Sequence, residues 1–221
     1  MIISIDGPAG SGKSTIAKIL SKKLGFVHFN SGSLYRGITA FVVDKNIDVE
    51  SFENYDFSTI KLEAKFIDNI QHVFVNGVDY TARLRDNEIS ILSPKVSVIK
   101  QVRSTVDACQ KDFASKNNVI IDGRDIGSFV FPNADIKFYL DCSIKERAKR
   151  RFKEEIIKNP NITISEIEQQ IAERDEFDKN KKIAPLVVPK NAIIIDSSLL
   201  SIEQVVDKML ENIKINKTKS F

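Results

Sequence analysis

Gly7-Pro8-Ala9-Gly10-Ser11-Gly12-Lys13-Ser14 decides the fold of this chain. It fits the pattern G-x-x-x-x-G-K-[ST] at every fixed position, and it stands between a short apolar run, Ile2–Asp6, and a stretch of helical spacing that begins at Ser14. Glycines let the backbone curl until several N–H groups face phosphate oxygens, and the start of the helix adds partial positive charge. The segment therefore predicts a strand, a phosphate-binding loop and a helix.

The loop supplies two side chains for phosphate chemistry. Lys13 brings a full positive charge to the β- and γ-phosphates of a nucleotide, and Ser14 offers a hydroxyl ligand to Mg²⁺. We therefore expect a nucleoside triphosphate to bind here with Mg²⁺. The predicted nucleotide-binding residues are Gly7, Pro8, Ala9, Gly10, Ser11, Gly12, Lys13, Ser14 and Thr15.

Short apolar runs alternate with helical patterns along the rest of the chain, which is typical of a parallel sheet wrapped by helices. The candidate strands are Ile2–Asp6, Val27–Asn30, Val119–Asp122, Ile136–Leu140 and Ile193–Asp196. They are short and rich in Ile, Val and Phe, as expected for strands covered on both faces. Helical spacing occurs over Ser14–Leu24, Lys100–Ser115, Ile144–Ile157, Ser165–Asn180 and Ile202–Ile213. We predict an α/β fold with a parallel five-stranded sheet.

Two segments interrupt this alternation. Residues 48–95 contain two runs of strand-forming residues, 63–67 and 72–75, and we predict an inserted antiparallel subdomain there. Residues 158–165 contain Asn159-Pro160-Asn161 between two charged helical stretches, which fits either a mobile connection over the site or an ordinary turn. The predicted division is a core of residues 1–47 and 96–221, including a helical lid around 144–180, and an insertion at 48–95.

The composition is that of a globular protein with reduced cysteines. Of 221 residues, 42% are hydrophobic and 29% charged, and no apolar stretch approaches about 18 residues, so no membrane span is expected. The net charge of +3 is small against 33 basic and 30 acidic residues, which gives no bulk signal of nucleic-acid binding. Cys109 and Cys142 lack C-x-x-C spacing, and the N-terminus lacks signal-peptide features. We expect a cytoplasmic protein.

The phosphate-binding loop does not by itself distinguish an NTPase switch from a kinase. A guanine-specific GTPase shows N-K-x-D after a core strand, whereas Asn216-Lys217-Thr218-Lys219 lies near the C-terminus and lacks the aspartate. Several arginines follow strands or stand in short polar motifs, namely Arg36, Arg124, Arg147, Arg150 and Arg151. Guanidinium groups bind phosphate bidentately, so this set suits an acceptor that is already phosphorylated, although a basic helix also forms salt bridges or binds RNA.

Short segments along nearly the whole chain match one family. They are Ile5–Pro8 with the loop, Ser31-Gly32 with Tyr35-Arg36, Asn76–Thr81, Val102-Arg103, Asp122–Gly127, Val130–Pro132, Glu146–Ala148, Glu173–Asp175 and Ala184–Leu186. With them the sequence resembles cytidylate kinases of the bacterial type. The Asp122–Gly127 and Ala184–Leu186 segments are specific to that family, against adenylate and thymidylate kinases. The resemblance implies a P-loop kinase fold and transfer of the γ-phosphoryl group of ATP, with Mg²⁺, to CMP or dCMP.

The resemblance also implies roles for individual residues. The implied catalytic set is Lys13, Asp122, Arg124, Arg147 and Arg151, with Asp122 near the phosphates and the last two arginines in a lid over ATP. The implied acceptor set is Ser31, Arg36 and Arg124 for phosphate and sugar, Arg174 with Asp178 for the ribose, Arg103 and Asp125 for cytosine, and Lys181 for phosphate. The chemistry of the set is consistent, because a carboxylate and an arginine together complement the amino group and ring acceptors of cytosine.

Three positions depart from the family pattern. Asn30 replaces the usual aspartate before Ser-Gly, and Pro94 stands where a serine often helps to hold the base, with Ser93 as its candidate substitute. Lys181 replaces a phosphate-binding arginine, which keeps the charge and loses the fork. These departures bear on acceptor affinity and base stringency more than on the reaction.

Two other classes of function remain open at this stage. One is another P-loop kinase, of UMP/CMP, thymidylate or shikimate type. The other is an RNA-binding NTPase, suggested by the basic helical stretch 145–153. Under the favoured reading we expect a monomer whose partners are nucleotides, with neither nucleic acid nor membrane among them, and packed or surface positions for His28 and His72.

Overall fold

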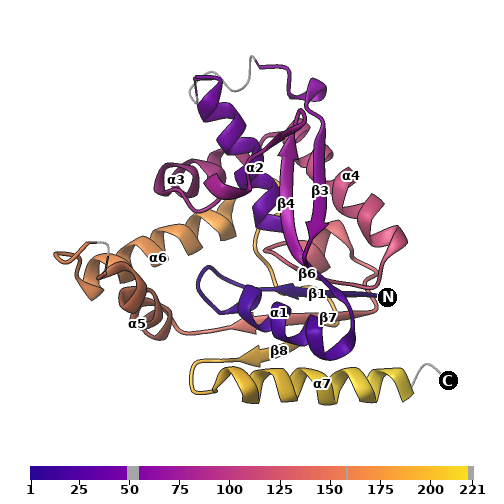
Figure 1. Ribbon diagram of the computed structural model, residues 1–221. Helices are drawn as coiled ribbons and strands as arrows, with labels where there is room; N and C mark the ends of the chain where they lie inside the picture. The colour runs from indigo at the N-terminus through magenta and orange to yellow at the C-terminus, as the bar shows by residue number, and fades with distance from the viewer. Residues whose placement is uncertain (49–54, 158, 219–221) are drawn as a thin grey trace. The chain divides into compact units, whose positions relative to one another are not determined.

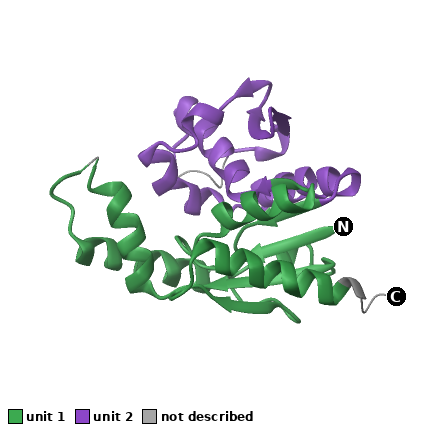
Figure 2. Cartoon of the chain, turned by 60° about the horizontal axis from the view of Figure 1, so that its bottom comes forward, with its two compact units in different colours: residues 1–28, 119–221 green, residues 29–118 purple. Residues whose placement is uncertain are grey.

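The computed structural model describes residues 1–48, 55–157 and 159–218. The chain forms two compact units, and each is described by itself. Unit 1 comprises Met1–His28 and Val119–Phe221, and unit 2 comprises Phe29–Asn118 (Figure 2).

Unit 1 is built on the parallel sheet. Its strands are β1 (Ile2–Asp6), β2 (Val27–Asn30, which leads into unit 2), β6 (Val119–Asp122), β7 (Ile136–Asp141) and β8 (Ile193–Asp196). They lie in the order β2-β6-β1-β7-β8, so β1, which precedes the phosphate-binding loop, is central (Figure 1). β1 pairs in parallel with β6 and β7, and β7 pairs in parallel with β8. The predicted sheet is confirmed, with β7 one residue longer than expected.

Four helices belong to unit 1 within the described residues. They are α1 (Lys13–Leu24), α5 (Ile144–Glu155), α6 (Ile164–Asn180) and α7 (Ile202–Thr218), with a π-helical turn, η4 (Ile126–Val130). α1 and α7 pack on the sheet, and α5 and α6 pack against each other. Side chains spaced for one helix face, such as Ile16 and Leu20 of α1 and Met209 of α7, pack against β-strand residues such as Phe138 in the buried core. α7 continues to Thr218, beyond the predicted end at Ile213, which is buried in this core. No helix in the described ranges is long and apolar enough to cross a membrane.

Unit 2 contains the predicted antiparallel sheet. Its elements are α2 (Ser31–Asp44), η2 (Phe57–Thr59), β3 (Leu62–Ile67), β4 (Ile70–Val75), β5 (Val78–Asp79), η3 (Thr81–Arg83), α3 (Asn87–Val96) and α4 (Lys100–Lys116). The strands lie in the order β3-β4-β5 and pair antiparallel. Two-residue turns join them: Asp68-Asn69 and Asn76-Gly77 all have positive φ, as tight hairpins require.

The compact unit is larger than the insertion predicted at 48–95, of which residues 49–54 lie outside the described part. Phe29, Phe66 and Phe113 form an aromatic cluster with ring centroids 4.8 to 6.1 Å apart, and this cluster joins the end of β2 and α4 to β3. α2 also approaches β4 closely, since a Cβ at Gly37 would lie 2.4 Å from Val73 Cγ1. Apolar packing thus groups α2 and α4 with the hairpin, which local sequence patterns did not reveal.

Candidate active site

The phosphate-binding loop connects β1 to α1 in unit 1. Gly7 has a φ of 145°, and a Cβ there would lie 2.2 Å from the carbonyl oxygen of Leu140, so no other residue fits. Gly10 and Gly12 also have positive φ, at 75° and 93°. Such angles are strained for residues with a side chain. The glycines of the motif are therefore required by the backbone path as well as by the approach of phosphate.

Lys13 is folded into its own loop. Its Nζ donates to the Pro8 carbonyl oxygen at 2.6 Å and contacts the Ser11 hydroxyl at 3.2 Å, and the side chain is buried. Burial and the nearby Arg124 guanidinium lower the pKa of Lys13 well below its usual value, although Asp122, Asp6 and Asp178 act in the opposite direction. A phosphate group in the loop would add negative charge beside this amine and favour its charged form.

Asp122 links three elements of unit 1. It ends β6, between β1 and β2, and its Oδ2 accepts a hydrogen bond from the hydroxyl of Ser14, 2.6 Å away at the start of α1. Its Oδ1 lies 2.7 Å from Nε2 of His28 on β2. Burial acts to raise the pKa of Asp122, but the hydrogen bonds from His28 and Ser14 outweigh it and lower that pKa. Asp122 is therefore an ionised, doubly held carboxylate beside the loop. His28, expected at a packed or surface position, is part of this arrangement.

Asp6 is a second buried carboxyl group, for which no separate role was predicted. Its two oxygens accept the backbone N–H groups of Ile126 and Gly127, each at 2.7 Å. A Cβ at Gly127 would lie 2.5 Å from the Ser4 hydroxyl oxygen and 3.1 Å from Asp6 Oδ2, so this glycine permits the close approach. Burial raises the pKa of Asp6 to about 6, although the two N–H groups act to lower it. Asp6 thus ties the segment after Asp125 to β1.

Replacing Asp6 by asparagine is expected to destabilise the fold, most strongly at low pH. The amide can accept only one of the two N–H bonds, and an unsatisfied buried donor costs about 1–3 kcal/mol. Because the folded pKa is raised from 3.8 to about 6, the stability that wild-type Asp6 contributes is present below pH 3.8 and is lost as the pH rises through 6. The stability difference between the two proteins should therefore shrink from pH 4.5 to pH 7.5 in urea titrations.

The control for this substitution is Asp135→Asn. Asp135 is exposed and accepts the N–H of Ile2 at the other end of β1, a single bond that an amide oxygen can also accept. A stability difference for Asp6→Asn that widens toward pH 7.5 would contradict the raised pKa of Asp6.

A cluster of two arginines and an aspartate lies in unit 1. Asp178 of α6 is buried, and its Oδ2 accepts from Nε of Arg124 at 3.1 Å and from Nε of Arg174 at 3.2 Å. Burial acts to raise the pKa of Asp178, but the cations Arg124, Arg174 and Lys181 outweigh it and lower that pKa. Both arginines use Nε for this contact. The pair Arg174 and Asp178, predicted from the resemblance, is thus joined by Arg124 at one carboxylate.

The two arginines predicted for the lid differ in environment. Arg147 of α5 is buried, and it donates to both oxygens of Asp175, with Nη1–Oδ1 at 3.0 Å and Nη2–Oδ2 at 2.5 Å. It also donates to the carbonyl oxygens of Cys142 at 2.8 Å and Ala9 at 2.9 Å, which ties α5 to the phosphate-binding loop. Arg151 is 43% exposed and pairs at 3.8 Å with Glu155 on its own helix. Only Arg147 touches the loop in this structure.

The remaining predicted acceptor residues belong to unit 2. Ser31 is buried at the first position of α2, and Arg36 lies one turn further along. Asn30 caps this helix, because its Oδ1 accepts the N–H of Ser33 at 2.8 Å, and it also accepts Arg36 Nη2 at 3.1 Å. Arg103 of α4 is buried, with its guanidinium carbon 5.9 Å from the ring centroid of Tyr35. Asn30 thus holds Arg36 without neutralising its charge, whereas the aspartate usual at this position would neutralise it.

Two further features of unit 2 bear on the predicted acceptor residues. Pro94 lies inside α3, and the adjoining Ser93, its candidate substitute, is mostly buried. A cavity of about 1040 Å³ lies between β3 and α4 and is bounded by residues such as Leu62 and Cys109. None of the predicted acceptor residues lines that cavity, which therefore gives no support to a nucleotide role for it.

Asp125 is the other residue predicted to read cytosine. It is buried in unit 1, directly before η4, and its carbonyl oxygen accepts the N–H groups of Phe129 at 2.9 Å and Val130 at 3.1 Å. The Asp6 contacts to Ile126 and Gly127 hold the same turn from the side of β1. The backbone around Asp125 is thus held at both ends of the turn.

Known structures share the fold at low sequence identity. An uncharacterized protein from Eubacterium ventriosum aligns with a TM-score of 0.51 at 13% identity, covering 97% of this chain and 98% of that one. Shikimate kinase from Acinetobacter baumannii, solved in complex with shikimate, aligns with a TM-score of 0.50 at 15% identity, covering 98% and 94%. These likenesses show the P-loop kinase fold and do not carry substrate information.

Sequence comparison is more specific. The family model for cytidylate kinase matches residues 3–215. A cytidylate kinase of Caldicellulosiruptor bescii is 40% identical over 211 residues, covering 95% of this chain and 93% of the relative. A cytidylate kinase of Thermotoga maritima is 36% identical over 213 residues, covering 96% of each. With the phosphate-binding loop and the arginine cluster of unit 1 on the same chain, these matches show that it belongs to the cytidylate kinase family and is a nucleoside monophosphate kinase.

Proposed function

We propose that this chain transfers the γ-phosphoryl group of Mg·ATP to CMP or dCMP, giving ADP and CDP or dCDP. The observation that carries the proposal is the joint presence, in unit 1, of a complete phosphate-binding loop and the cluster formed by Arg124, Arg174 and Asp178. A kinase that acts on an already phosphorylated acceptor needs both: a cradle for the triphosphate and fixed positive charge for the acceptor.

ATP would be held by residues 7–15. Backbone N–H groups of the loop and the start of α1 would face the phosphates, and Lys13 would leave its contact with the Pro8 carbonyl oxygen to reach the β- and γ-phosphates. Arg147, already bonded to the Ala9 carbonyl oxygen, would hold the loop against α5. Arg151 would contact ATP from the lid only after leaving Glu155.

The residues beside the loop also fit Mg²⁺. This ion prefers hard oxygen ligands and in kinases uses few protein ligands together with substrate phosphates. The Ser14 hydroxyl would bind it, and the Asp122 carboxylate, 2.6 Å away, completes a local pair of oxygen donors. When bound, Mg²⁺ neutralises phosphate charge during transfer.

The acceptor would be bound by charge and shape. Arg124, Arg174 and Lys181, with Ser31 and Arg36 of unit 2, would contact its phosphate and sugar, and Asp178 would hold the arginines in place. Arg103 and Asp125 would read the cytosine. The acceptor phosphate is already anionic and nucleophilic, so positioning and electrostatic stabilisation supply the catalysis without a strong general base.

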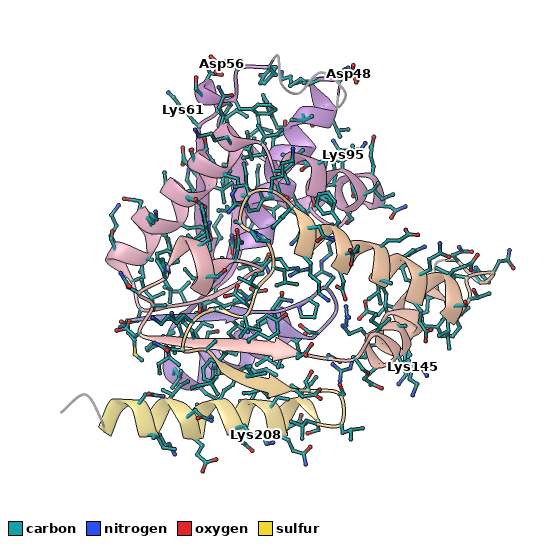
Figure 3. All side chains as sticks on the ribbon, turned by 180° about the vertical axis from the view of Figure 1, so that it is seen from behind. Asp48, Asp56, Lys61, Lys95, Lys145 and Lys208 are labelled. Carbon is teal, nitrogen blue, oxygen red and sulfur yellow. The ribbon has the colours of Figure 1, made fainter. Side chains whose placement is uncertain are left out.

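The RNA-binding alternative has little support from the basic helix that suggested it. In α5, Arg147 is committed to Asp175, and Arg150 donates to Glu146 at 3.3 Å and to the Ser197 carbonyl oxygen at 2.9 Å. Lys145 is exposed at the start of the helix (Figure 3). The arginines of α5 therefore bind within the protein. We propose, as the sequence suggested, a cytoplasmic, monomeric enzyme whose partners are nucleotides, with neither nucleic acid nor membrane.

Product analysis tests this function. Incubation with Mg·ATP and CMP should give ADP and CDP in equal amounts by ion-exchange chromatography, with little free phosphate. Addition of RNA at low salt should leave the rate unchanged. Free phosphate in place of CDP, together with a rate that RNA raises, would instead support the RNA-binding NTPase.

A further inference from the structure

Asp122 is held through both of its oxygens. Oδ2 accepts from the Ser14 hydroxyl at 2.6 Å, and Oδ1 lies 2.7 Å from His28 Nε2. The side chains of Asp122 and His28 are 4% and 19% exposed, so both partners meet largely away from solvent. The contact crosses from β2 to β6, two neighbouring strands of the sheet. β6 lies between β2, which carries His28, and β1, which leads into the phosphate-binding loop.

We propose that His28 is a positioning residue for the Mg·nucleotide: it fixes the Asp122 carboxylate, which in turn fixes the orientation of the Ser14 hydroxyl. This inference rests on the proposed function. It assigns a role in that function to a residue outside the segments that carry the family resemblance. The proposal does not require His28 to contact the nucleotide. It acts through Asp122.

The direction of each hydrogen bond supports this role. A carboxylate can only accept, so the Ser14 hydroxyl must donate its proton to Oδ2, and His28 must carry its proton on Nε2 and donate to Oδ1. With its proton directed at Asp122, the Ser14 oxygen turns its lone pairs away from that carboxylate. Those lone pairs are what a divalent cation binds. The same geometry therefore orders the hydroxyl as a metal ligand before the nucleotide arrives.

His28 also restricts the rotation of the Asp122 side chain. Removing the imidazole would take away the partner of Oδ1, while the Ser14 hydroxyl would still donate to Oδ2. Partners of this kind, one bond behind the groups that face a metal, commonly change metal affinity by about 10-fold to 100-fold when they are removed. The expected loss thus falls on binding that involves the metal, and nucleotide binding without metal should change little.

Calorimetric titration of ADP, with and without Mg²⁺, tests the inference. His28→Phe keeps a packed ring and removes the donor, so the affinity for Mg·ADP should fall about tenfold while the affinity for metal-free ADP changes less than twofold. His28→Gln places an amide N–H at a similar reach and should recover most of the loss. His28→Asn, one methylene shorter, should not, and it serves as the second negative variant if His28→Phe fails to fold.

His72 provides a matched control. It is also a strand histidine paired with an aspartate, with Nδ1 3.0 Å from Asp79 Oδ2, but it lies on β4 in unit 2. His72→Phe should leave both ADP affinities unchanged. Equal losses of ADP and Mg·ADP affinity in His28→Phe, or no recovery in His28→Gln, would overturn the inference. Failure of the proposed function would appear separately, as absence of CDP from the wild-type enzyme.

Discussion

Replacing Lys13 by alanine is expected to lower kcat by about a thousandfold or more, because its charge stabilises the phosphoryl group during transfer. The structure shows this amine folded onto the Pro8 carbonyl oxygen, at the centre of the loop where the phosphates would lie. The substitution removes a buried side chain whose contacts are local, so the fold should persist. Steady-state rates with saturating Mg·ATP and CMP, with thermal denaturation as a check on folding, measure the effect.

Lys18→Ala is the control for this substitution. Lys18 lies on the same helix, α1, and is exposed, so its removal should leave kcat close to that of the wild type. Near-normal turnover in Lys13→Ala would contradict the assignment of residues 7–15 as the ATP site.

Asp125→Asn is expected to change base selectivity. In the proposed site the carboxylate accepts a hydrogen bond from the cytosine amino group, whereas uracil has an oxygen there and faces repulsion and an unpaired buried group. Sites of this kind discriminate by roughly a hundredfold to ten-thousandfold. An amide could donate to the uracil oxygen, so kcat/KM for CMP should fall and the ratio of CMP to UMP efficiencies should shrink. Catalytic efficiencies for both acceptors in both proteins measure this.

Asp125 also has a competing interpretation. It precedes the turn that Asp6 holds through Ile126 and Gly127, and it adjoins Arg124. If kcat/KM for CMP and UMP fell together in Asp125→Asn, with their ratio unchanged, the residue would be positioning this segment and would not read the base.

The sheet of unit 1 could be predicted from the sequence because its signals are local. Runs such as Val119–Asp122 are short, apolar and flanked by helical patterns, which is how buried parallel strands appear. The hairpin of unit 2 was likewise marked by Asn76-Gly77. The extent of unit 2 was not predictable in this way, since it depends on packing among Phe29, Phe66 and Phe113, which lie far apart along the chain.

In the active site, too, the features with a local sequence signal could be predicted and the long-range contacts could not. The loop follows a strict pattern, so its residues and their backbone angles could be anticipated. The contacts of Asp6 with Ile126, of His28 with Asp122 and of Arg147 with Asp175 could not, because each joins residues 28 to 120 positions apart through the fold. For His28, the one available signal was its place on a predicted strand. That this strand borders β6 could not be predicted, because strand order is not encoded locally.

The acceptor panel tests the central claim most directly. Rates of ADP formation with Mg·ATP would be measured for CMP, dCMP, UMP, AMP, dTMP and shikimate at equal concentrations. Cytidylate specificity predicts the highest kcat/KM for CMP or dCMP, with UMP lower by roughly a hundredfold or more, because a site built for the cytosine amino group leaves buried groups unpaired with uracil. A higher efficiency with AMP, dTMP, UMP or shikimate than with either cytidylate would contradict the account.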